Sequence, residues 1–116
     1  MTDQRLGKKD SQDAGENSVS VLIEIHAQEG REGQVRDLFT KTIASSQKPG
    51  LISYEIFEDP RDAGGFYSMQ VWKSADAFQA HMAQAAQGGM SDSVALLREA
   101  PRTRVLRTTA QAVWKE

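Results

Sequence analysis

LISYEIFEDPRDAGGFYSMQVW, residues 51–72, has the pattern of two strands joined by a turn. Both flanks, Leu51–Glu58 and Phe66–Trp72, are rich in the aromatic and branched side chains that favour strands. The residues between them are Asp, Pro, Arg, Ala and Gly, which is the typical composition of a chain reversal. Because a short turn joins neighbouring strands in opposite directions, the stretch predicts an antiparallel hairpin.

Side chains of a strand alternate between the two faces of a sheet, so residue parity predicts which of them share a face. We expect one face of the hairpin, turned toward helices, to carry Ile52, Tyr54, Ile56, Tyr67, Met69 and Val71. We expect the other face of the sheet to carry Leu22, Glu24, Leu51, Phe57, Phe66, Trp72 and Val113, mixed with Ser68, Gln70 and Thr109.

The chain on either side of the hairpin repeats one pattern, a strand next to an amphipathic helix. Upstream, VSVLIEIHA at residues 19–27 alternates as a strand, and apolar residues spaced by three and four predict a helix over 31–47. Pro49 and Gly50 end that helix. Downstream, Ser74 caps a helix over 74–87.

After the second helix we expect a shorter helix that begins at Ser91 and ends before Pro101, and then a last strand over residues 103–113. The order is therefore strand, helix, strand, strand, helix, strand. Two βαβ halves joined in this way predict a ferredoxin-like α+β sandwich, with a four-stranded antiparallel sheet and both helices on one face.

Composition limits the class of protein. The chain has 116 residues, no cysteine and a net charge of −2, which argues against disulfides, thiolate metal sites and a nucleic-acid binder. No apolar stretch is long enough to span a membrane, and no apolar segment of an export signal follows the first lysines, so we expect a cytoplasmic protein. Residues 1–18 hold few apolar side chains and predict a disordered arm, which leaves one domain over 19–116.

The face of the sheet away from the helices is too apolar to remain in water and too polar for a second layer of helices. Stacking two such faces about a two-fold axis is the simplest way to bury them. The pattern predicts a homodimer.

His81 is the first candidate for chemistry, because it lies in the apolar stripe of the second helix between Phe78 and Met82. We expect its ring to point between helix and sheet, toward Tyr54 and Tyr67. There it serves either as a general base near neutral pH or as an ordinary core histidine. Its position alone favours the core histidine.

Other side chains suggest alternatives. His26 and Glu24 share a strand face away from the helices and form either a polarised pair or an exposed or interface pair. Tyr54, Tyr67 and Trp72 are able to line the pocket of a flat aromatic ligand, and singly each is more often core packing. Met69, Met82 and Met90 are more often gap-fillers than a cofactor box. Four arginines, Arg98, Arg102, Arg104 and Arg107, fit a solvated edge strand better than an anion site.

Four short runs with a characteristic order and spacing follow each other along the chain. They are Lys48-Pro49-Gly50-Leu51-Ile52-Ser53-Tyr54-Glu55, Asp59-Pro60, Gln70-Val71-Trp72 and Ala77-Phe78-Gln79-Ala80-His81. In these runs the chain, from about Val19 to Val113, resembles the antibiotic biosynthesis monooxygenase family. The family pattern is Glu-Pro-Gly with a tyrosine four residues later, an Asp-Pro turn, Glu-x-Trp and Ala-x-x-x-His. Lys48 and Gln70 stand where the family has glutamates.

The resemblance implies a dimeric α/β barrel of two ferredoxin-like chains that oxidises a quinol, an anthrone or a related electron-rich aromatic with dioxygen. It implies no cofactor and no metal. The implied roles are proton transfer for His81 and ring positioning with oxyanion stabilisation for Tyr54 and Trp72. The implied substrate-binding residues are Tyr67, Met69, Gln70, Phe78 and Met82.

The sequence bears on three other functions. Haem degradation is disfavoured, because residues 90–100 contain no histidine and Ile23 stands where that branch has an asparagine. A binding or dimerisation module without turnover stays open. Isomerisation of a small phosphorylated dione also stays open, and it requires the arginines near residues 98–107 to face the pocket.

Overall fold

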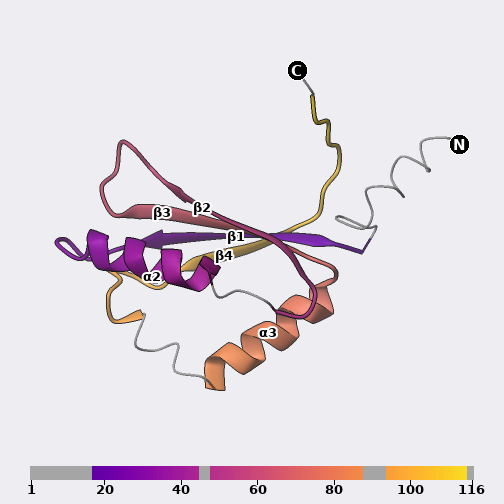
Figure 1. Ribbon diagram of the computed structural model, residues 1–116, viewed down its shortest axis with the longest axis horizontal. Coiled ribbons are helices and arrows are strands. Elements are labelled where there is room, and N and C mark those ends of the chain that lie inside the picture. Colours follow the sequence, from indigo (N-terminus) through magenta and orange to yellow (C-terminus); the bar gives the residue numbers. More distant parts are fainter. Residues whose placement is uncertain (1–16, 45–47, 88–93, 115–116) are drawn as a thin grey trace, which may run out of the picture.

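The computed structural model describes residues 17–44, 48–87 and 94–114. Its elements are β1 (Val19–His26), α2 (Glu32–Ala44), β2 (Leu51–Glu58), β3 (Gly65–Trp72), α3 (Ala75–Gln87) and β4 (Arg102–Leu106). The strands form one four-stranded sheet in the order β2-β3-β1-β4, and every neighbouring pair is antiparallel. Both helices lie on one face of it (Figure 1).

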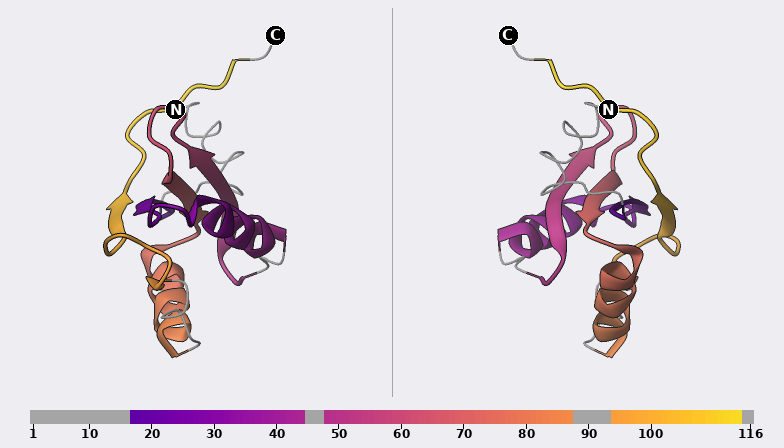
Figure 2. Two further views of the ribbon diagram at one scale, coloured as in Figure 1. Left: turned by 90° about the vertical axis from the view of Figure 1, so that its left-hand side faces the viewer. Right: turned by 90° about the vertical axis from the view of Figure 1, so that its right-hand side faces the viewer.

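The predicted ferredoxin-like α+β fold is therefore confirmed. The sheet formed by the described strands is open, with β2 and β4 at its edges, so a single chain does not close a barrel. Figure 2 shows the consequence in two further views: one face of the sheet carries α2 and α3, and no helix of the described residues covers the other.

The hairpin predicted from the central stretch is present, but its faces are the reverse of our expectation in β3. Val21 of β1 pairs with Gln70, and Tyr54 of β2 pairs with Gln70 from the other side. The helix-facing residues of β3 are consequently Phe66, Ser68, Gln70 and Trp72.

The physical reason for this error lies in the polar residues of β3. We expected Ser68 and Gln70 on the face away from the helices, yet both are buried on the helix-facing side, where each has a hydrogen-bond partner. Tyr67 and Met69 lie on the opposite face.

The last strand is shorter than predicted. β4 ends at Leu106, and residues 107–114 run away from the sheet on the side opposite the helices (Figures 1 and 2). They contain no strand, because β4 is an edge strand and this segment has no neighbour to pair with in the described chain. Val113 and Trp114 at its end are 80% and 85% exposed.

Two buried clusters hold the helices to the sheet. Under α2, Ile25 and Phe66 pack with Val35. Under α3, Val21 and Trp72 pack with Phe78. Each cluster lies toward one end of the sheet, so the middle of the helix-facing surface is covered by neither.

Local signals fix the ends of the helices near their predicted positions. The backbone N–H of Ala77 donates to Ser74 Oγ at 3.1 Å, which confirms Ser74 as the cap of α3. Gly50 has φ +85°, and its carbonyl accepts a hydrogen bond from the backbone N–H of Lys73 at 2.8 Å. The turn before β2 is thereby joined to the segment that enters α3.

Replacing Gly50 with alanine is expected to lower the free energy of unfolding by about 2–4 kcal/mol. The new Cβ would lie 2.6 Å from Cβ of Ala77 and would adopt a left-handed backbone conformation. Gly33→Ala in α2 is the matched control, because its Cβ meets nothing within 4 Å. In the control variant the free energy of unfolding should rise by up to about 1 kcal/mol, because alanine favours a helix more than glycine does. Equal urea midpoints for the two variants would contradict the assigned contact.

Two expectations fall outside the described residues. The predicted disordered arm, residues 1–18, lies almost entirely before Asn17, and the start of the short helix at Ser91 is also outside. Within the described ranges, no helix is long and apolar enough to cross a membrane. The cytoplasmic location remains a prediction from the sequence.

Candidate functional site

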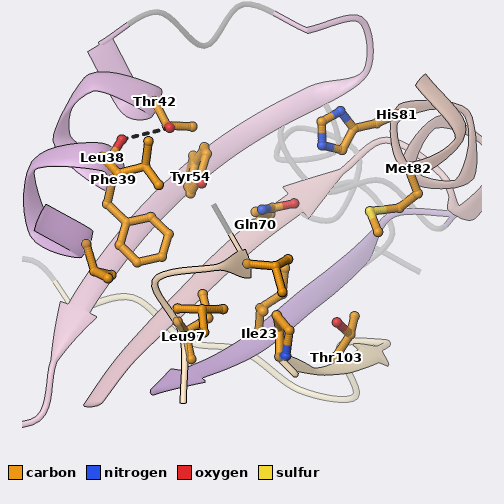
Figure 3. Close-up of a pocket in the computed structure, with 14 residues that line it drawn as sticks. Ile23, Leu38, Phe39, Thr42, Tyr54, Gln70, His81, Met82, Leu97 and Thr103 are labelled. Atoms are coloured by element: carbon orange, nitrogen blue, oxygen red, sulfur yellow. Dashed lines mark hydrogen bonds between the residues drawn. The ribbon is translucent and has the colours of Figure 1, made fainter. Parts of the chain in front are cut away.

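A cavity of about 430 Å³ opens between the two helices over the middle of the sheet (Figure 3). This volume is in the range of small-molecule sites. The described residues of its walls are mostly apolar, and none of them is charged. These residues are Ile23, Ile25, Val35, Leu38, Phe39, Thr42, Tyr54, Gln70, His81, Met82, Val94, Leu97, Pro101 and Thr103.

A row of buried side chains along β3 lies beneath the floor of the cavity, and of its members Gln70 lines the cavity itself. Trp72 Nε1 donates to Gln70 Oε1 at 2.8 Å, and Gln70 Nε2 donates to Ser68 Oγ at 3.4 Å. The row forms because residues 68, 70 and 72 share one face of the strand, and the glutamine side chain is long enough to reach both neighbours. Trp72 and Ser68 are 1% exposed and Gln70 is 6% exposed, so water does not compete for these bonds.

Tyr54 extends this row onto β2, where it lies directly opposite Gln70. Burial raises the pKa of the Tyr54 hydroxyl, and side-chain hydrogen bonds with Ser68 and Gln70 act in the opposite direction. The phenol therefore keeps its proton at neutral pH. Figure 3 shows Tyr54 and Gln70 together on the sheet side of the cavity.

His81 enters the cavity from α3, and its ring stacks on Trp72 with ring centres 5.1 Å apart and planes 26° from parallel. Among the described residues, neither ring nitrogen has a hydrogen-bond partner. The aromatic stack, rather than a carboxylate, therefore sets the orientation of the imidazole.

The charge state of His81 follows from its surroundings. Burial lowers the pKa of His81 below its ordinary value, and the positive charge of Lys48 lowers it further. A neutral imidazole with unpaired nitrogens is chemically suited to accept a proton from a ligand in the cavity. Lys48, which departs from the family pattern, thus favours the base form of this histidine.

The structure brings together four of the predicted site residues as cavity-lining groups: Tyr54, Gln70, His81 and Met82. Trp72 and Phe78 lie behind that surface, where their rings pack together with centres 5.9 Å apart. The placement of Tyr67 and Met69 in the pocket is wrong, because the register of β1 with β3 puts both on the opposite face. His81 therefore faces Tyr54 but not Tyr67.

Sequence reasoning missed part of the site. Ser68 lies on the helix-facing side together with Phe66 and Gln70, whereas the sequence predicts the open face for all three. The part of the cavity wall that α2 contributes was also not predicted from the sequence. Thr42 there interrupts an apolar stripe, and its hydroxyl donates to the carbonyl of Leu38 at 2.8 Å (Figure 3).

The other histidine lies outside the cavity. His26 Nε2 donates to Glu24 Oε2 at 2.8 Å and lowers the pKa of that carboxyl, so the predicted pair exists. Arg102 and Arg104 pair with Glu24 and Leu22 on the same open face, on the edge strand β4. These two arginines face away from the cavity, so neither of them offers it the anion site that a phosphorylated dione needs.

A metal would need several ligands in one place. Among the described residues, no three histidine, cysteine, aspartate or glutamate side chains gather closely enough to hold a metal ion.

The family model for antibiotic biosynthesis monooxygenase matches residues 18–90. No curated protein sequence matches the chain.

Solved structures share the fold. A crystal structure of an antibiotic biosynthesis monooxygenase is 18% identical over 79% of this chain and 99% of its own, with a TM-score of 0.70. A variant of SnoaB, a cofactor-independent oxygenase from Streptomyces nogalater, is 16% identical over 82% and 96%, with a TM-score of 0.70. Rv0793 from Mycobacterium tuberculosis is 18% identical over 83% and 99%, with a TM-score of 0.71.

Proposed function

Since the chain belongs to the antibiotic biosynthesis monooxygenase family, we propose that it is a monooxygenase that oxidises a quinol, an anthrone or a related electron-rich aromatic with dioxygen. The observation that carries the proposal is the cavity itself. An uncharged, mostly apolar space places the neutral imidazole of His81 and the phenol of Tyr54 on the same enclosed volume.

The chemistry assigns a task to each part of the site. Triplet dioxygen reacts slowly with a neutral anthrone or quinol but accepts one electron from the corresponding anion. In the proposed reaction His81 removes the proton, and the apolar walls hold the ring and exclude water. Hydrogen-bond donors stabilise the negative charge on the substrate oxygen until the electron leaves.

The reaction needs no external reductant when the substrate is an anthrone. The anion gives one electron to dioxygen, the carbon radical and superoxide combine, and the protonated hydroperoxide loses water. A CH₂ group and O₂ thus yield a carbonyl group and one H₂O. The substrate supplies all the electrons, so the protein has to supply only position, a base and hydrogen bonds.

Dioxygen consumption tests the proposal. Anthrone and a panel of reduced naphthoquinones are added to the protein without any cofactor, and the rate of spontaneous oxidation in buffer is subtracted. We expect a protein-dependent increment that saturates with substrate. Thermal stabilisation by these ligands without any increment would instead support a binding module.

We also propose that the chain functions as a homodimer through the open face of the sheet. Leu22, Tyr67, Met69 and Val71 lie on this face at its centre, and Phe57 beside them is 46% exposed. An apolar surface of this kind, uncovered by the described residues, favours an isologous contact with a second copy.

Replacing Met69 with glutamate should weaken the proposed dimer by about 100-fold or more, because each copy would bury a carboxylate in the contact. Gln79→Glu on the exposed side of α3 is the control and should leave association unchanged. Sedimentation equilibrium measures both. A wild-type protein that sediments as a monomer at micromolar concentration would refute the proposed assembly.

A further inference from the structure

One end of the cavity is closed by a short segment between α3 and β4 rather than by a helix or a strand. We call residues 94–98 of this segment the end wall. Val94 and Leu97 of the end wall line the cavity. Leu97 packs against the buried cluster under α2, and Figure 3 shows it across the cavity from His81. The end wall therefore closes the cavity on the side opposite His81.

Gln28, just after β1, binds three consecutive carbonyl groups of the end wall. Its backbone N–H donates to the carbonyl of Leu96 at 2.9 Å. Its side-chain Nε2 donates to the carbonyls of Ala95 at 3.2 Å and Leu97 at 3.3 Å. The backbone N–H of Leu97 donates to the carbonyl of Val94 at 2.9 Å, so these residues form a turn. Carbonyls at the end of such a turn have no donor within it, and Gln28 supplies the donors from outside.

Two backbone contacts accompany the bonds of Gln28. The backbone N–H of Arg98 donates to the carbonyl of His26 at 2.8 Å, and Ala27 and Leu97 form an isolated antiparallel bridge. A substitution at position 28 leaves these contacts in place and changes only the side-chain donor. It is therefore able to loosen the end wall without detaching it.

The two ends of the cavity rest on different parts of the sheet. Met82, on the same helix as His81, packs against the cluster that contains Val21, whereas Leu97 packs against the cluster that contains Ile25. These two residues of β1 are four positions apart, which is about 13 Å along a strand. A short ligand beside His81 is thus expected to miss the end wall, and a longer one to reach it.

We infer that Gln28 is a positioning residue that fixes the end wall, so that the cavity favours flat aromatic ligands long enough to contact Leu97, with three fused rings rather than two. This inference rests on the proposed function, because it takes the cavity as the site of an aromatic substrate. Gln28 acts through the end wall, since its own side chain is exposed and does not line the cavity. A wall that is already in place costs less to order when the ligand binds.

Binding of two quinones of different length tests this role without any oxidation. The probes are 1,4-naphthoquinone, with two fused rings, and 9,10-anthraquinone, with three, and the chain has no cysteine for a quinone to alkylate. Of the two tryptophans, Trp72 stacks on His81 at one end of the cavity. In a Trp114→Phe background a bound quinone quenches the fluorescence of Trp72 alone. We expect this protein to bind anthraquinone more tightly than naphthoquinone.

Substitutions at position 28 should change this selectivity. Gln28→Glu retains the size of the side chain but places a carboxylate, which has no proton to donate, against two carbonyl oxygens. We expect the affinity for anthraquinone to fall about three- to tenfold and that for naphthoquinone by less than about twofold. Gln28→Lys retains N–H donors and should restore most of the affinity. If Gln28→Glu does not fold, Gln28→Ala removes the donors without adding a charge.

The control and the contrary results are defined in advance. Gln79→Glu makes the same change on the exposed side of α3 and should alter neither affinity. A protein with wild-type Gln28 that does not bind anthraquinone more tightly, or a Gln28→Glu protein with undiminished affinity for it, would overturn the inference. An equal loss for both quinones would also overturn it, because general destabilisation has that effect.

Dioxygen uptake from anthrone, measured in parallel, separates this inference from the proposed function. Gln28→Glu should raise the KM for anthrone more than it lowers kcat, because His81 lies at the opposite end of the cavity. A selective loss of anthraquinone binding in Gln28→Glu, without any uptake by the wild-type protein, would support the role of Gln28 and reject the oxygenase.

Discussion

His81→Ala is expected to lower the protein-dependent rate of dioxygen uptake by about 10²- to 10⁴-fold, the usual contribution of a general base. The imidazole is the one side chain of the described cavity wall that is able to take up a proton near neutral pH. The stack on Trp72 fixes its ring, and burial with Lys48 keeps it neutral. Without it, deprotonation of the substrate falls to water.

His26→Gln is the matched control, because His26 is the other histidine of the chain and lies on the opposite face of the sheet. It should retain the wild-type rate. His81→Asn keeps a polar side chain of similar size and should be as inactive as His81→Ala. A His81→Ala protein with more than about a tenth of the wild-type increment would show that His81 is not the base.

The pH dependence provides a second signature of the same residue. The pKa of His81 is lowered in the folded protein, so the imidazole stays in its base form to a lower pH than a free histidine. After correction for the ionisation of the substrate, the rate of dioxygen uptake should therefore begin to fall only at a pH below the ordinary pKa of histidine. Between the folded and unfolded pKa values the unfolded chain binds more protons, so stability should rise with pH in that window. His81→Asn should remove this contribution, which urea unfolding at several pH values measures.

The fold could be predicted from the sequence because the patterns that determine it are local. The turn between Glu58 and Gly65, the cap at Ser74 and the reversal at Gly50 each depend on a few neighbouring residues. The last strand was predicted too long, because a β-like pattern after Leu106 does not reveal whether a neighbouring strand is present to pair with it.

Only part of the site could be predicted from the sequence, and the reason differs from that for the last strand. His81 and Tyr54 lie in periodic apolar patterns, which place a side chain on a face without reference to the rest of the chain. The faces of β3 depend instead on which polar groups find partners after folding. Ser68 and Gln70 tolerate burial because Gln70 donates to Ser68 and accepts from Trp72, contacts that a residue-by-residue pattern does not reveal.

Trp72→Ala is expected to destabilise the protein by about 3–5 kcal/mol. The indole is 1% exposed and packs between Val21 and Phe78, so its removal opens a large cavity under α3. It also leaves the Gln70 oxygen without its donor and His81 without its stack.

Trp72→Phe separates these effects. The smaller ring retains much of the contact with Phe78 and His81, so we expect a loss of about 1–3 kcal/mol, mainly from the unpaired Gln70 oxygen. Urea unfolding of both variants measures the difference between them, which is the part due to packing. If Trp72→Phe is as stable as wild type, then the Gln70 oxygen finds another donor and the indole N–H does not fix the amide. If Trp72→Phe is instead as unstable as Trp72→Ala, the unpaired Gln70 oxygen within β3 accounts for most of the loss, and the ring contacts with Phe78 and His81 contribute little to stability.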